Sequence, residues 1–178
     1  MVSIAVVGGG FAGVGAVRML RRAGYEDVAV FERAPRVGGV WHHNTYPGAA
    51  CDVPSHLYEF SFAPNPRWSR RYAPQPEIQR YLEDVARSYG VRDRIKTGVE
   101  VTEATWDEDR ARWRIQTSAG EHEADVLLTG CTSWYLDENG HDPNQWPWRW
   151  STYRRRTAEL APAVYELGYH TRQPALAA

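Results

Sequence analysis

A short, uninterrupted run of apolar residues at positions 4–7 passes directly into a glycine-rich stretch at positions 8–13. The run shows no helical period and has the length of a buried strand, far short of a membrane span. Apolar residues then recur at helical spacing, and Gly24 marks the end of the predicted helix. The residues predicted to face a sheet are Ala12, Ala16, Val17 and Leu20. A second predicted strand at 27–31, apolar from Val28 onward and followed by Glu32, completes a predicted β–α–β unit.

Farther along, the pattern predicts one more helix and then several strands. Pro76 suits the first residue of that helix, and Gly90 suits its end. Its core-facing positions are Ile78, Leu82, Val85 and Tyr89. Alternating runs at 99–106, 112–117 and 123–129 predict a small antiparallel β-meander at about 99–129, whose last residues return to the parallel sheet. The predicted fold class is α/β, a Rossmann-like domain with a parallel sheet flanked by helices and a small β-meander.

Length and composition narrow the functional classes. The chain has 178 residues, which suits one domain or slightly more, and a net charge of -1, which gives no general attraction to nucleic acid or membranes. Cys51 and Cys131 are far apart, so neither a disulfide framework nor a zinc site is predicted. No apolar stretch reaches membrane length, and the chain opens on a strand rather than a secretion signal. These features favour a cytoplasmic protein without a metal site.

The glycine-rich stretch has the G-x-G-x-x-G spacing of a dinucleotide-binding fingerprint. Gly8 permits a tight turn after the strand, Gly10 lets the backbone approach a pyrophosphate, and Gly13 lets the helix pack close to the sheet. The helix N-terminus offers unpaired N–H groups to phosphate, and the carboxylate of Glu32 suits two ribose hydroxyls. That carboxylate also argues against NADP, whose 2′-phosphate would face it. The alternative is a glycine-rich turn in an ordinary β–α–β unit.

Ordered motifs continue through the long loop that follows Glu32. Residues 38–41 read Gly-Gly-Val-Trp, residues 46–52 read Tyr-Pro-Gly-Ala-Ala-Cys-Asp, and Trp68 opens a further motif that runs to Ile78. This series resembles the FAD-binding half of Baeyer–Villiger monooxygenases, which are relatives of the flavin-containing monooxygenases. The resemblance covers nearly everything from Ser3 to about Leu127.

The resemblance implies an FAD-binding flavoprotein whose family uses NADPH and oxygen to oxidise ketones or heteroatoms of small molecules. The cofactor-binding residues that it implies are Gly8, Gly10, Phe11, Gly13, Glu32, Arg33, Gly39, Val40, Trp41, Asp52, Tyr58 and Val101. Asp52 matches a family aspartate beside the flavin and is the predicted catalytic residue, although it also fits a simple loop cap. If buried without its family arginine partner, Asp52 would change its protonation.

The later part of the chain resembles the family's extreme C-terminal segment, from about residue 129 onward. The predicted domains are therefore 1–130, which binds FAD, and a family tail at 131–178 that packs back on it. The family's NADPH domain is missing between them, and after Gly13 no second G-x-G-x-x-G occurs. We therefore expect no NADPH site and impaired NADPH-driven oxygenation. The surface that such a domain would cover is expected to favour self-association.

Three hypotheses stay open at this point. The chain is a flavin-dependent monooxygenase by ancestry, or a non-enzymatic FAD-binding remnant or partner subunit, or an NAD-binding Rossmann module of unrelated function. The interleaved tryptophans and arginines at 146–156 also suggest a stacking surface for nucleic acid. Without net positive charge, cation–π packing of a family tail explains them better, so no nucleic-acid partner is predicted.

Overall fold

The computed structural model describes residues 1–130. The predicted C-terminal segment at 131–178 lies outside the described residues, and so do its resemblance to the family tail and its predicted packing on the FAD-binding domain.

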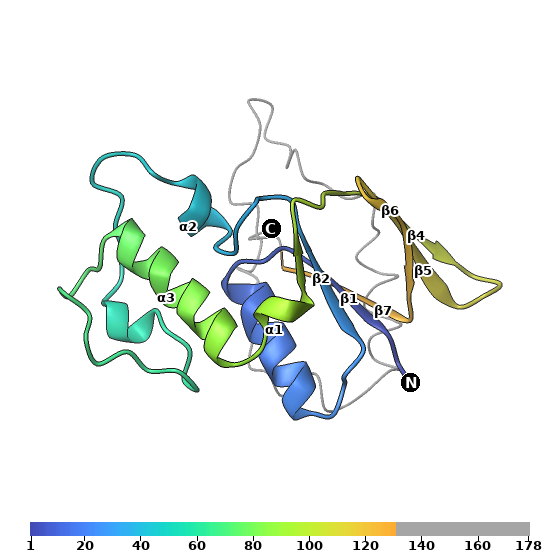
Figure 1. Ribbon diagram of the computed structural model, residues 1–178, viewed down its shortest axis with the longest axis horizontal. Helices are drawn as coiled ribbons and strands as arrows, with labels where there is room; N and C mark the ends of the chain where they lie inside the picture. Colours follow the sequence, from blue (N-terminus) through green and yellow to red (C-terminus); the bar gives the residue numbers. More distant parts are fainter. Residues whose placement is uncertain (131–178) are drawn as a thin grey trace, which may run out of the picture. The chain divides into compact units, whose positions relative to one another are not determined.

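A parallel sheet of four strands, in the order β3-β2-β1-β7, organises the described residues (Figure 1). Its strands are β1 (Ile4–Val7), β2 (Val28–Glu32), β3 (Ile95–Thr97) and β7 (Val126–Thr129). Every neighbouring pair is parallel, so the predicted α/β, Rossmann-like fold class is confirmed. Strand β3 was not predicted, because three residues are too few to show an alternating pattern.

Helix α1 (Phe11–Arg22) and helix α3 (Gln75–Ser88) pack beside each other on one face of this sheet (Figure 1). The residues of α1 that are buried are Gly13, Val14, Val17 and Leu20. The prediction was right for Val17 and Leu20 and wrong for Ala12, which is exposed, and Ala16, which is half-buried. The reason is the close contact of Gly13 with Gly8, which turns the Gly13–Val17 side of the helix toward the sheet.

Helix α3 begins one residue before the predicted start. Pro74 caps it, Gln75 is its first residue and Pro76 its second, which keeps the proline within the first turn, where its missing N–H costs nothing. Of the predicted core positions, Ile78, Leu82 and Val85 are buried, and Tyr89 is half-buried just after the helix. Gly90 then takes a positive φ of 64°, as expected of a residue that ends a helix.

A separate antiparallel sheet is formed by β4 (Val101–Asp107), β5 (Arg112–Thr117) and β6 (Gly120–Ala124). The predicted third run at 123–129 was wrong in its bounds, because it is divided at Asp125 into the end of β6 and strand β7. The Asp125 carboxylate accepts hydrogen bonds from the N–H (2.7 Å) and hydroxyl (2.9 Å) of Ser3, which fixes the chain where it enters the parallel sheet.

The second sheet contacts the face of the parallel sheet opposite the helices. Val30 belongs to the core shared with α1 and α3, whereas the ring of Phe31 lies 4.8 Å from that of His122 on β6. Successive residues of a strand point to opposite faces, so the two contacts mark the two sides of β2. The carboxyl end of β2, with Glu32, is thus held from both sides.

The long segment between β2 and α3 contains the short helices α2 (Val40–His43) and η1 (Ser55–Leu57), and η2 (Arg92–Arg94) precedes β3. The buried Ser55 hydroxyl accepts from Ala73 N–H (2.7 Å) and donates to Arg71 C=O (3.1 Å). These bonds fasten the middle of the segment to the residues just before α3. In the part of the chain described here, no helix has both the length and the apolar character needed to cross a membrane.

Tyr81 of α3 holds the next turn of the segment. Its hydroxyl accepts from Phe60 N–H (2.7 Å) and donates to Ala63 C=O (2.9 Å). Replacing Tyr81 with phenylalanine leaves both backbone groups without this partner, so we expect the free energy of unfolding to fall by about 1–3 kcal/mol near neutral pH. Urea unfolding measures this change, and Tyr46→Phe, at a side chain that is 63% exposed, is the matched control.

The same hydroxyl predicts a dependence on alkaline pH. Burial raises the pKa of Tyr81 from 10.0 to about 12, so the folded state favours the neutral phenol. Its stabilisation is therefore complete below pH 10 and is lost as the pH rises from 10.0 toward about 12. Over that interval Tyr81→Phe should lose stability less steeply than the unaltered chain, and equal slopes would contradict the assignment.

Candidate functional site

The turn between β1 and α1 has the geometry of an anion-binding site. Gly8 has a φ of 99°, which favours glycine, and Gly10 is the N-cap of α1 with no side-chain hydrogen bond to the helix. The first turn of α1 contains no acidic residue. Within residues 1–130, no side chain therefore caps the N–H groups at the start of the helix, where its positive dipole end favours an anion. A Cβ on Gly13 would lie 1.9 Å from the Gly8 carbonyl oxygen, so only glycine allows this packing.

A second pair of glycines lies against this turn. Gly38 N–H donates to Gly9 C=O (3.0 Å), and Gly39 has a φ of 56°. A Cβ on Gly39 would lie 3.0 Å from Gly10 Cα, so the two backbones approach at a distance that a side chain on Gly39 would disturb. The fold therefore brings the predicted residues Gly10 and Gly39 together, although they lie far apart in the sequence.

Glu32 stands at the carboxyl end of β2 beside the same turn and is only 5% exposed. Its Oε2 accepts from Gly9 N–H (2.6 Å), and its Oε1 accepts from Ala34 N–H (2.7 Å). These bonds stabilise a buried carboxylate and fix its direction. Each carboxylate oxygen has a further lone pair with which it can accept from a ligand hydroxyl.

The aromatic residues predicted for the site form one cluster. The ring of Tyr58 lies 4.8 Å from that of Phe11 and 5.7 Å from that of Trp41, both in edge-on geometry. Trp41 also donates its indole N–H to the Tyr58 hydroxyl (3.2 Å). The cluster joins the start of α1 to α2. The predicted residues Arg33 and Val40 are exposed.

The other two predicted residues lie apart from the glycine turn in sequence and in different surroundings. Asp52 is exposed, so the burial on which its expected change of protonation depended is absent. Val101 is half-buried at the start of β4, paired with Thr117 of β5. No group of three metal-ligating side chains is found among residues 1–130.

Two residues of the site were missed by the sequence reasoning. Gln75 and Gln79 lie one turn apart on α3 and are 9% and 7% exposed. They donate to Trp41 C=O and Val37 C=O, which lie on either side of Gly38 and Gly39. The available signal was their spacing, because residues at i and i+4 share one face of a helix, and this face adjoins the apolar one.

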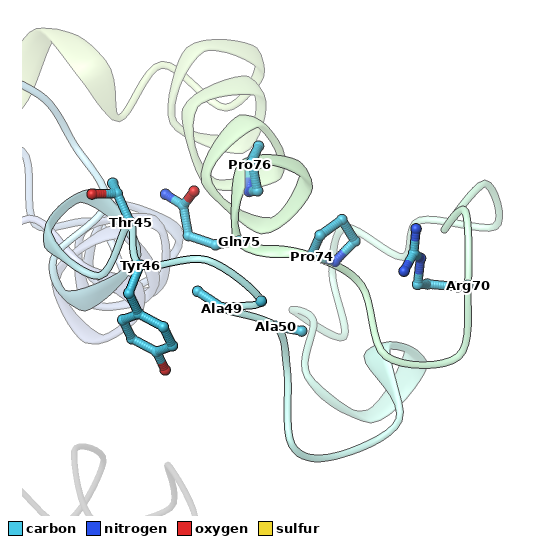
Figure 2. A pocket seen from close by; sticks show the side chains of 9 residues that line it. Thr45, Tyr46, Ala49, Ala50, Arg70, Pro74, Gln75 and Pro76 are labelled. Carbon is cyan, nitrogen blue, oxygen red and sulfur yellow. The ribbon is translucent and has the colours of Figure 1, made fainter.

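A cavity of about 250 Å³ opens at the start of α3 (Figure 2). Its lining residues are Thr45, Tyr46, Gly48, Ala49, Ala50, Arg70, Pro74, Gln75 and Pro76. The volume is below the roughly 300–1,000 Å³ of typical ligand clefts, so this cavity does not suit a dinucleotide. The glycine turn contributes none of its lining residues.

Comparison with known proteins agrees with this geometry. Residues 6–74 match the family described as NAD(P)-binding Rossmann-like domain, so the chain contains a dinucleotide-binding Rossmann region. A Baeyer–Villiger monooxygenase of Streptomyces coelicolor is 51% identical over 128 residues, which cover 72% of this chain and 25% of the relative. A Baeyer–Villiger monooxygenase of Pseudomonas aeruginosa is 41% identical over 128 residues, which cover 71% and 24%.

Solved structures give the same result. An oxidised steroid monooxygenase bound to NADP superposes with a TM-score of 0.69 at 43% identity, covering 72% of this chain and 25% of that one. A complex of OTEMO with FAD and NADP gives 0.68 at 28% identity, with coverage of 72% and 25%. The chain matches the N-terminal FAD-binding region of the Baeyer–Villiger, FAD-binding monooxygenase family, as the sequence motifs predicted. It spans about a quarter of the length of the relatives it matches.

Proposed function

We propose that residues 1–130 bind FAD and that the chain is a flavoprotein of Baeyer–Villiger type. The observation that carries the proposal is the uncapped start of α1 at Gly10, bordered by the Glu32 carboxylate and by Gly39. The absence of a Cβ at Gly10 and Gly39 leaves room for a close backbone approach, which a pyrophosphate requires. These residues therefore fit the cofactor that the family motifs imply.

In this proposal each element has a separate task. The N–H groups at the start of α1 bind the pyrophosphate, and the free lone pairs of Glu32 accept from the ribose hydroxyls. In this proposal, the aromatic cluster of Phe11, Trp41 and Tyr58 lies along the part of FAD that extends away from the glycine turn. Bound FAD would supply the redox chemistry, and the chain supplies position and charge.

The activity that we assign to the chain is narrower than that of the family. No second G-x-G-x-x-G follows Gly13, so we propose that the chain has no NADPH site of its own. NADPH-driven oxidation of a ketone or heteroatom is then impaired, and Asp52 is the residue that we assign to the family's catalytic position. The second candidate, favoured by the same missing motif, is a non-enzymatic FAD-binding remnant or partner subunit.

The absorption spectrum of the purified chain tests the proposal. We expect flavin bands in protein isolated with its cofactor, and saturable quenching of flavin fluorescence when FAD is added to protein stripped of it. A titration with NAD is the matched comparison, because both dinucleotides contain an ADP half that Glu32 can bind. Binding of NAD without binding of FAD would replace this proposal with an unrelated NAD-binding module.

A further inference from the structure

Two buried glutamines of α3 hold the segment that carries Gly38 and Gly39. Gln79 Nε2–H donates to Val37 C=O (2.5 Å), and Gln75 Nε2–H donates to Trp41 C=O. The two acceptors lie directly before and after the three residues at 38–40. A helix is rigid on the scale of one turn, so this pair of bonds fixes both ends of the segment at once. Figure 2 shows Gln75 at the start of α3, with its amide directed toward the loop segment that contains Thr45 and away from Arg70.

The amide of Gln79 has only one orientation that its neighbours allow. Its nitrogen faces two acceptors, Val37 C=O and the Glu83 carboxylate at 2.9 Å, so an exchange of nitrogen and oxygen would place acceptor against acceptor. Its oxygen is buried, has no hydrogen-bond partner among the residues described, and would lie 2.0 Å from a Cβ on Gly38. Leaving an acceptor unpaired in the interior is unfavourable. The hydrogen bonds that the amide nitrogen donates therefore hold this side chain in place.

An ion pair extends these contacts from Gln79 toward the protein surface. Arg36 lies just before the held segment, and its Nη2 is 2.7 Å from Glu83 Oε1, the same oxygen that receives the Gln79 amide. From the other side, Gly38 N–H donates to Gly9 C=O, and Gly39 lies against Gly10. The contacts therefore run from α3 through the held segment to the fingerprint turn.

We propose that Gln75 and Gln79 are positioning residues of the FAD site. They set the distance between the Gly38–Gly39 segment and Gly10, and this distance decides whether a pyrophosphate fits at the start of α1. The inference rests on the proposed function, because it concerns the ligand assigned there. Neither glutamine needs to touch the cofactor, since each acts through the backbone that it holds.

The test uses Gln79→Met and Gln75→Met in the full chain. Methionine keeps the length of the side chain and removes the amide donor. We expect the Kd for FAD of each variant, measured on folded protein, to rise by about tenfold, the change that accompanies loss of one hydrogen bond. The control is Val85→Ala, at a buried position on the same helix that does not contact the held segment through a hydrogen bond. It should lower the unfolding temperature and leave the Kd unchanged.

A second measurement does not depend on FAD. Amide hydrogen exchange without cofactor should speed up at residues 38–41 in the glutamine variants and not in Val85→Ala. An unchanged Kd in both glutamine variants, or an equal loss in Val85→Ala, overturns the inference while leaving the proposed function intact. Failure of the unaltered chain to bind FAD overturns both. Unchanged exchange at 38–41 overturns the inference even where a variant is too unstable for titration.

Discussion

Gly10→Ala is expected to weaken FAD binding by about a hundredfold or more while leaving the fold intact. Gly10 has a φ of -84° and a ψ of -160°, which alanine adopts readily. A Cβ there would lie 3.4 Å from Gly39 Cα, an ordinary contact distance, so the chain itself can accommodate it. The methyl group would instead occupy the space that the pyrophosphate must enter, and two or more charge-assisted hydrogen bonds would be lost.

Gly13→Ala is expected to act differently from Gly10→Ala, on the fold and not on the ligand. A Cβ on Gly13 would lie 1.9 Å from Gly8 C=O, so this second substitution should disrupt the packing of α1 on the sheet and destabilise the protein without any ligand. Circular dichroism and urea unfolding follow the fold, and quenching of flavin fluorescence follows binding. Unaltered FAD affinity in a folded Gly10→Ala chain would show that the pyrophosphate lies elsewhere.

The parts of the site that the sequence predicted are those in which a local conformation requires one residue type. Gly8 and Gly39 have positive φ values, Gly13 has no space for a side chain, and Glu32 ends a strand beside the turn. Each requirement acts over a few residues and can therefore be recognised as a short sequence motif. The α/β fold class followed from the same run of strand, glycine turn and helix.

The parts that the sequence did not reveal depend on contacts between distant segments. Gln75 and Gln79 are polar residues on a helix, and only the tertiary fold shows that they are buried against the backbone at Val37 and Trp41. The division of the last predicted strand at Asp125 likewise depends on Ser3, 122 positions away. Such pairings form only in the folded structure, so the periodicity of the local sequence does not indicate them.

Titration with NADPH is expected to show no tight binding to the FAD-loaded chain. The sequence has no second G-x-G-x-x-G after Gly13 that could bind the second dinucleotide of the family. In the first site, Glu32 places a negative charge where the 2′-phosphate of NADPH would lie. Calorimetry on the FAD-loaded protein measures this directly. The control is FAD added to the stripped chain under the same conditions. Micromolar affinity for NADPH would contradict the expectation and point to a site of a different kind.

Oxidation of ketones by the 178-residue chain is expected to be very slow, even with FAD bound and NADPH supplied. No second G-x-G-x-x-G follows Gly13, so we expect no site that would position a hydride donor. Electrostatic stabilisation is usually the largest catalytic contribution, and the loss of one donor costs about a hundredfold or more. Asp52, the predicted catalytic residue, is exposed to solvent.

Product analysis on a panel of cyclic and aromatic ketones checks this expectation. Chemical reduction of the FAD-loaded chain followed by exposure to air should give hydrogen peroxide in place of ester, because we expect water to have access to the flavin. Free FAD treated in the same way is the control for chemistry that needs no protein. Ester formed at about one turnover per second or faster, an ordinary rate for an enzyme, would show that the 178-residue chain suffices for oxygenation. The low rate is therefore expected to reflect a missing hydride donor, while FAD binding itself is retained.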